Sequence, residues 1–150
     1  MGLTVFTNGC FDVYTAVHYK ILLRCRQLAG KGGKVIVGLD TDEKIKKDKG
    51  ENRPIFSYSE RANVLGSETL DNESGRGEWL VDLICPFNTN EELKNLIIKH
   101  KPHVLVKGYD WLGKGIVGSD VVPVVDVMPK YDHNHSTTEI IERILKKHSK

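Results

Sequence analysis

Short apolar runs alternate with longer amphipathic stretches along the whole chain. Each run is nearly continuous and has the length of a strand, which is typical of a parallel sheet covered by helices on both faces. The pattern therefore predicts an α/β fold in which strands and helices alternate. The predicted strands are Leu3–Thr7, Lys34–Leu39, Trp79–Cys85, Val104–Lys107 and Val121–Val127.

The amphipathic stretches carry their own start and stop signals. A helix is expected from about Val17 to Leu28, ended by Gly30. Three further helices are expected after potential capping boxes, in which a hydroxyl residue precedes a glutamate by three positions. Joined by right-handed crossovers, these elements form a doubly wound, Rossmann-like five-stranded parallel sheet. The boxes are Ser57-x-x-Glu60, Thr89-x-x-Glu92 and Ser136-x-x-Glu139.

Length and composition limit the possible classes of protein. The 150 residues predict one domain, residues 1–150, with 39% hydrophobic and 28% charged residues as in soluble globular proteins. A formal net charge of +2 is too small to indicate a nucleic-acid partner. The chain has no apolar run of membrane-spanning length and no signal peptide pattern, so no membrane partner is expected.

The cysteines and histidines show no metal-ligand spacing. An odd number of cysteines without such spacing indicates free thiols in a reducing cytoplasm. His133 and His135, with Asp132, are interpreted as a polar loop and not as a metal site, so no protein-held metal is expected. The cysteines are Cys10, Cys25 and Cys85.

Polar stretches follow four of the predicted strands. In open α/β sheets, ligands bind beyond the carboxyl ends of the strands, where the strand order switches. All four stretches should meet on that edge, and the last one begins a helix, which favours an anion. The lysines alone would suit a solvated basic loop equally well. The stretches are Thr7–His18, the lysines at 44, 46, 47 and 49, Lys107–Asp110 and His135–Thr138.

The first of these stretches is neither a dinucleotide fingerprint nor a Walker loop. Its glycine could still bring backbone amides near Gly9–Phe11 to a nucleotide phosphate. Cys10 has no neighbour in sequence that lowers its pKa, so a packing role is favoured over a nucleophilic one.

The same stretches resemble the nucleotidyltransferase superfamily that includes cytidylyltransferases and ADP-heptose synthase. TNGCFD, with the helix after it, resembles the GxFDxxHxGH signature, and KGENRPI (Lys49–Ile55) resembles the loop after the second strand. The stretch from Arg61 to Leu65 resembles the helix that follows. VLVKGYDW (Val104–Trp111) resembles the fourth-strand motif, and HSTTEIIERI (His135–Ile144) resembles the ISTT-type motif.

The resemblance implies a reaction and its partners. A phosphate on a sugar or polyol attacks the α-phosphate of a nucleoside triphosphate in line and releases pyrophosphate, usually with Mg²⁺. The protein's task is to position the substrates and stabilise the charge of the transition state. Members of the superfamily are commonly dimers, so a homodimer is possible.

The resemblance also implies roles for individual residues. His18, Lys46 and Thr15 match catalytic positions, Thr15 standing where the signature has its first histidine. The nucleotide-binding positions matched are Thr7, Gly9, Cys10, Phe11, Asp12, Lys49, Lys107, Gly108, Asp110, Ser136, Thr137 and Thr138.

The chain departs from the signature at several positions. Thr15 replaces a histidine and Val17 replaces a glycine, and Lys130 stands near a family arginine. Removing one preorganised donor of this type typically costs a factor of about 10²–10³ in turnover. The polar stretch Asp71–Glu78 resembles an inserted loop.

Three interpretations of the function remain open. TNGCFD, GENRPI and STTEII favour adenylyl transfer to a heptose phosphate-like acceptor. DWLGK (Asp110–Lys114) instead resembles glycerol-3-phosphate cytidylyltransferase. Thr15 and Val17 would suit a catalytically impaired relative that still binds nucleotide.

Overall fold

Five parallel strands form the central sheet of the computed structural model, which describes residues 2–71, 77–130 and 136–149. Their order is β5-β2-β1-β6-β7, and every pairing between neighbours is parallel. The strand order reverses between β1 and β6, which confirms the expected doubly wound, Rossmann-like fold. The strands are β1 (Thr4–Gly9), β2 (Lys34–Asp40), β5 (Leu83–Phe87), β6 (Val104–Lys107) and β7 (Val124–Val127).

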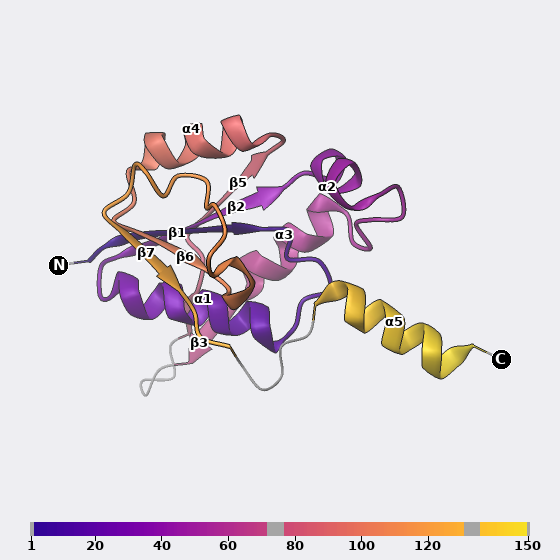
Figure 1. Ribbon diagram of the computed structural model, residues 1–150. Helices are drawn as coiled ribbons and strands as arrows, with labels where there is room; N and C mark the ends of the chain where they lie inside the picture. Colours follow the sequence, from indigo (N-terminus) through magenta and orange to yellow (C-terminus); the bar gives the residue numbers. More distant parts are fainter. Residues whose placement is uncertain (1, 72–76, 131–135, 150) are drawn as a thin grey trace.

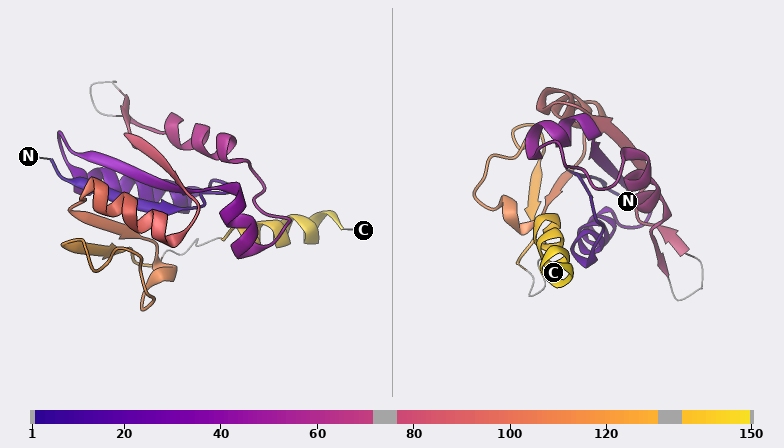
Figure 2. Two further views of the ribbon diagram at one scale, coloured as in Figure 1. Left: turned by 90° about the horizontal axis from the view of Figure 1, so that it is seen from above. Right: turned by 90° about the vertical axis from the view of Figure 1, so that its right-hand side faces the viewer.

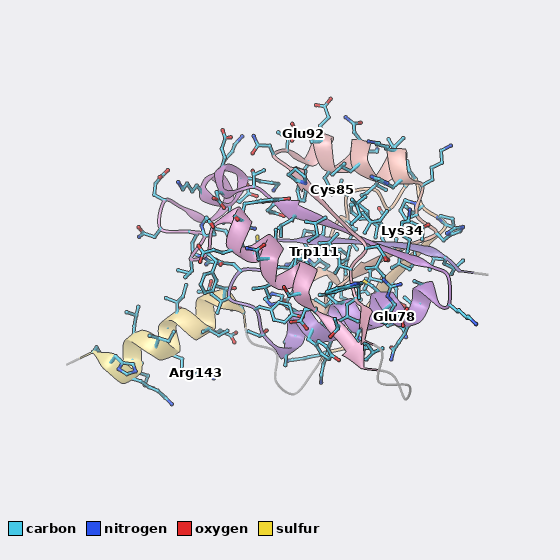
Figure 3. All side chains as sticks on the ribbon, turned by 180° about the vertical axis from the view of Figure 1, so that it is seen from behind. Lys34, Glu78, Cys85, Glu92, Trp111 and Arg143 are labelled. Atoms are coloured by element: carbon cyan, nitrogen blue, oxygen red, sulfur yellow. The ribbon has the colours of Figure 1, made fainter. Side chains whose placement is uncertain are left out.

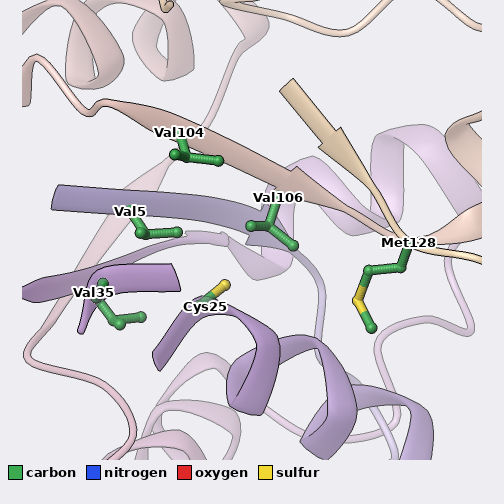
Figure 4. Close-up of a cluster of buried hydrophobic side chains, with 7 residues drawn as sticks. Val5, Cys25, Val35, Val104, Val106 and Met128 are labelled. Atoms are coloured by element: carbon green, nitrogen blue, oxygen red, sulfur yellow. The ribbon is translucent and has the colours of Figure 1, made fainter. Parts of the chain in front are cut away.

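Helices cover both faces of this sheet. Figure 1 shows α1 (Ala16–Ala29) and α3 (Tyr58–Ser67) on one face and α4 (Asn90–His100) on the other. Successive strand residues point to opposite faces, so Val5 packs on the α1 side and Phe6 on the α4 side. Figure 4 shows the cluster beside α1, in which Cys25 packs among valines of three strands.

Helix α1 follows its sequence pattern closely. Leu22 and Cys25 are fully buried against the sheet. Gly30 ends the helix with a φ of +69°, a conformation that glycine adopts at little cost, and its N–H donates to the Arg26 carbonyl at 3.1 Å.

The remaining helices lie beyond the carboxyl ends of the strands (Figure 1). These are α2 (Asp42–Lys49), the 3₁₀ helix η1 (Tyr109–Trp111) and α5 (Thr137–His148). Helix α5 extends away from the rest of the molecule (Figures 1 and 3, and the left view of Figure 2). The carboxyl edge of the sheet is therefore framed by short helices.

The strand expected over Trp79–Cys85 is wrong in its boundaries. The chain instead forms a two-stranded antiparallel ribbon from β3 (Thr69–Asp71) and β4 (Gly77–Trp79), and β5 starts later. Asp82 divides the apolar run, because its carboxylate accepts from the Arg26 guanidinium and the Val35 N–H. Trp79, expected in the core, is 57% exposed. Residues 72–76 of the expected inserted loop lie outside the described residues.

Two further expectations need correction. The last strand starts at Val124 and not at Val121, because Pro123 has no N–H to donate to the ladder. The lysines after β2 lie on helix α2 and not in a loop. Thr41 caps that helix by accepting from the Lys44 N–H at 3.2 Å, and only Ile45 is buried, so the helix lacks an apolar stripe that would reveal it. Asp132, His133 and His135 lie outside the described residues.

Candidate nucleotide site at the strand switch point

A cleft opens where β1 and β6 stop pairing. Their ladder has the register pairs Val5↔Val104 and Phe6↔Leu105, and ends there. Beyond it, side chains bridge the two strands: the Thr7 hydroxyl donates to the Val106 carbonyl at 2.8 Å, and the Lys107 ammonium donates to the Asn8 carbonyl at 3.1 Å. The resulting cleft has a volume of about 750 Å³, which is in the range of small-molecule sites.

Most of the predicted site residues line this cleft. Thr15, Lys46 and Thr138 do not. Lys46 follows Lys44 by two positions, which turns it to another side of α2. The predicted residues that line the cleft are Thr7, Gly9, Cys10, Phe11, Asp12, His18, Lys49, Lys107, Gly108, Asp110, Ser136 and Thr137.

The loop after β1 is held in an unusual conformation. Phe11 and Val13 have φ values of +48° and +47°, in the left-handed region that disfavours residues with a Cβ atom. The Asp12 carboxylate between them is fully buried and accepts from the Ile55, Phe56 and Val13 N–H groups at 2.7, 3.0 and 3.2 Å. These hydrogen bonds fix the loop after β1 against the segment before α3.

His18 is held as a neutral donor at the start of α1. Its Nδ1 accepts from the Thr15 N–H at 3.1 Å, so the other ring nitrogen, Nε2, carries the proton of the neutral ring. Burial, helped by Lys49 and opposed by Asp12, lowers the pKa of His18 to about 4. The imidazole is thus uncharged at neutral pH and keeps one N–H for a ligand.

Thr15 does not extend this donor set. Its hydroxyl oxygen is buried and has no hydrogen-bond partner within the described parts of the chain. Val17, which replaces the family glycine, does line the cleft and adds a branched side chain to its wall.

Lys107 is the most deeply buried cation of the cleft. It is 4% exposed, and its ammonium lies 4.3 Å from the centre of the Trp111 ring. Burial lowers the pKa of Lys107 to about 8, although the Asp40 carboxylate acts in the opposite direction. A buried ammonium that is still charged at neutral pH is suited to a phosphate ligand, because little water screens it.

Lys44 also lines the cleft, although in the sequence it stands out only as one member of a basic cluster. Its ammonium lies 3.8 Å from Asp40 and 2.5 Å from Asp48. The Cys10 thiol donates to the same Asp40 carboxylate at 3.5 Å, and burial and Asp40 raise the pKa of Cys10 to about 11. The spacing of Asp40, Lys44 and Asp48 at intervals of four is the sequence signal that would have found this group.

Two glycines leave the floor of the cleft without side chains. A Cβ atom on Gly9 would come no closer than 3.4 Å to a protein atom, and one on Gly108 no closer than 3.6 Å. Neither glycine has a positive φ, so neither the fold nor the backbone conformation requires it. Both glycines line the cleft, where a bare backbone allows a ligand to approach closely.

The start of α5 forms the remaining wall. The Thr137 hydroxyl donates to the Asp12 carbonyl at 2.9 Å, and Thr138 accepts from Arg53 at 3.4 Å. Ser136 caps the helix by accepting from the Glu139 N–H at 3.1 Å. The helix N-terminus, which attracts anions, is thereby fixed to the loop after β1.

The described segments contain no group of three or more His, Cys, Asp or Glu side chains arranged to hold a metal ion. In the same segments, no helix combines the length and apolar character needed to cross a membrane.

Known proteins of similar sequence indicate the family of this chain. Residues 6–143 match the model of the cytidylyltransferase-like family. The chain is 47% identical to the bifunctional protein HldE of Campylobacter concisus over 140 residues, which is 93% of this chain and 26% of that protein. It is 38% identical to the bifunctional protein HldE of Pelobacter propionicus over 149 residues, covering 97% of this chain and 28% of the relative.

The chain thus spans about a quarter of the length of these curated relatives. Among solved structures, the lipopolysaccharide core biosynthesis protein from Thermoplasma volcanium superposes with a TM-score of 0.61 at 19% identity. The match covers 88% of this chain and 100% of that one, and supports the same fold.

Proposed function

Because this chain belongs to the cytidylyltransferase-like family and is therefore a nucleotidyltransferase domain, we propose that it transfers an adenylyl group from ATP to a heptose phosphate-like acceptor. The motifs TNGCFD, GENRPI and STTEII favour this donor and acceptor. The observation that carries the proposal is the position of His18 in the cleft, as a neutral N–H donor beside the glycine-lined floor.

In this reaction a phosphate oxygen of the acceptor attacks the α-phosphorus of ATP. A new P–O bond forms as the bond from the α-phosphorus to the bridging oxygen breaks, and pyrophosphate leaves with the electron pair. Such a reaction needs positioned donors around the α-phosphate and no covalent enzyme intermediate. Mg²⁺ would enter with the triphosphate and neutralise part of its charge.

Neutral and positively charged residues of the cleft would have different roles in this reaction. His18 would donate its Nε2–H to the phosphate that undergoes attack. Lys107 and Lys49, which line the cleft, would neutralise phosphate charge, and the N-terminus of α5 would add its backbone N–H groups. Trp111 would bound the acceptor side of the cleft.

A direct assay tests the proposal. The protein is incubated with Mg²⁺ and each of ATP, CTP, GTP and UTP, together with a panel of heptose, hexose and polyol phosphates, and pyrophosphate release is measured. We expect the highest rate with ATP and a heptose phosphate. His18→Ala serves as the matched inactive control, with an expected loss of about 10²–10³. Absence of pyrophosphate with every pair would contradict the proposal.

Two alternatives have specific support. The stretch Asp110–Lys114 favours CTP and glycerol 3-phosphate, and the same panel would reveal this pair by its rate. The Thr15 hydroxyl, which is buried and has no hydrogen-bond partner among the described residues, favours an impaired relative. Measurable nucleotide binding without turnover would support that second alternative.

We also propose that the protein works in a reducing compartment. Cys10, Cys25 and Cys85 are free thiols, which supports a reducing compartment such as the cytoplasm. A homodimer would be tested by sedimentation.

A further inference from the structure

We infer that Arg61 is a positioning residue of this nucleotidyltransferase: without touching a substrate, its guanidinium sets the loop after β1 and helix α2 in the arrangement that transfer requires. The inference rests on the proposed function and extends it to a residue that does not line the cleft. Arg61 lies in the first turns of α3, a helix fixed by the capping box of Ser57 and Glu60.

The Arg61 side chain makes four hydrogen bonds from one buried position. Its Nε donates to the Phe56 carbonyl at 3.0 Å, and one terminal nitrogen donates to the Cys10 and Asp40 carbonyls, both at 2.8 Å. The other terminal nitrogen donates to the Asp42 carboxylate at 2.8 Å. The guanidinium thereby joins the loop after β1, the end of β2, the start of α2 and the segment before α3.

Because Arg61 is buried, the loss of any of these hydrogen bonds would be costly in free energy. Arg61 is 1% exposed, whereas the carboxylate of Asp42 is 41% exposed. A buried cation is expensive unless every donor is satisfied, so the three carbonyls must stay close to the guanidinium in the folded protein. The planar fork of arginine can reach four acceptors in different directions, which the single ammonium of lysine cannot reproduce.

The connected segments are those that carry the cleft donors. Cys10 precedes the left-handed residues Phe11 and Val13 of the nucleotide loop. Asp42 begins α2, and the same helix carries Lys44 and Lys49 into the cleft. A displacement of about 1 Å in such groups is enough to lower turnover by about 100-fold.

The experiment compares two buried arginines changed to lysine. Arg61→Lys keeps the charge and removes the fork at the cleft edge of the sheet. Arg26→Lys is the matched control, because Arg26 is 7% exposed and also bonds two carbonyls and one carboxylate, those of Gly33, Leu80 and Asp82. Gly33 directly precedes β2, so this network lies at the opposite edge of the sheet.

Three quantities are measured for both variants: kcat/KM for the nucleotide, thermal stability, and amide hydrogen exchange. We expect Arg61→Lys to lower kcat/KM by about 10- to 100-fold and to speed exchange in residues 8–13 and 53–57. Arg26→Lys should lower thermal stability while both other quantities stay at the wild-type level. Wild-type kcat/KM and exchange in Arg61→Lys would overturn the inference, as would an equal loss of kcat/KM in Arg26→Lys.

A second variant decides the matter if Arg61→Lys does not fold. Asp42→Ala removes only the partly exposed carboxylate partner, and should lower kcat/KM about threefold with faster exchange in α2; no change in either would overturn the inference. If the wild-type protein releases no pyrophosphate with any pair, the proposed function fails separately. The inference is then decided by exchange and by calorimetric affinity for Mg²⁺-ATP and Mg²⁺-CTP, which should weaken in Arg61→Lys and not in Arg26→Lys.

Discussion

Burial decides which side chains of the cleft carry charge at neutral pH. It lowers the pKa of His18 to about 4 and that of Lys107 to about 8, and it raises the pKa of Cys10 to about 11. At pH 7 the imidazole is therefore neutral, the thiol is protonated and the Lys107 ammonium is still charged. The cleft is thus lined by hydrogen-bond donors and by the buried ammonium of Lys107, in addition to its more exposed lysines.

These pKa values predict an asymmetric pH profile. A lysine is charged below its pKa, so kcat/KM for the nucleotide should fall as the pH rises through about 8. It should stay level between pH 6 and 7, because neutral His18 is already the dominant form above pH 4. Arginine stays charged throughout, so Lys107→Arg should shift the falling limb upward. An unmoved limb in this variant would exclude Lys107 as its source.

The departures from the family signature give a second prediction for single residues. Thr15→His combined with Val17→Gly would restore the signature and remove a branched side chain from the cleft wall. Turnover should rise by about tenfold or more if the missing donor limits the reaction. Steady-state pyrophosphate release is measured for the double variant and for each single variant. An unchanged or lower rate would show that this chain catalyses transfer, or fails to, for another reason.

At the scale of elements, α1 and α5 are opposites. Helix α1 buries Leu22 and Cys25 completely in the core, whereas no described residue of α5 is buried. Ile144 and Leu145 of α5 are 55% and 63% exposed. Thr137 and Thr138 bond the first turn of α5 to the Asp12 carbonyl and to Arg53, which ties this end of the helix to the cleft.

This contrast predicts different costs for similar substitutions. Leu22→Ala should lower the free energy of unfolding by about 2–5 kcal/mol, because it leaves a cavity in a packed core. Ile144→Ser with Leu145→Ser should change it by no more than about 1 kcal/mol, since both side chains already contact water. Urea unfolding of the two variants provides the comparison. A large loss in the α5 variant would show that its apolar side is covered in solution.

At the scale of the whole molecule, the doubly wound parallel sheet, with a cleft beyond the carboxyl ends of its strands, was predictable from apolar runs and helix signals. The sequence pattern misled where a single polar contact decided the structure, as when Asp82 bonded Arg26 and divided one strand. It also missed α2, whose stability comes from a cap and from charge, with little apolar burial. The Arg61 network joins residues up to 51 positions apart, so no local pattern could reveal it.

Ligand binding offers a prediction for the molecule as a whole. A nucleoside triphosphate at about 100 times its dissociation constant should stabilise the folded state by about 2.7 kcal/mol. For a chain of this size that raises the melting temperature by about 5–10 °C. Scanning fluorimetry with Mg²⁺-ATP and Mg²⁺-CTP at equal concentrations measures the shift, which should be larger for ATP. No shift with either nucleotide at millimolar concentration would argue against the cleft as a nucleotide site.

The bare floor at Gly9 and Gly108 has a consequence for how this site can evolve. The groups that face the cleft there belong to the main chain. Substitutions at neighbouring residues change side chains and leave these backbone groups in place. The walls are different, because Asn90, Trp111 and Ile116 line the cleft with side chains. In the proposed function, inherited change at the walls would therefore alter the choice of base and acceptor, while the bare floor would still admit a phosphate.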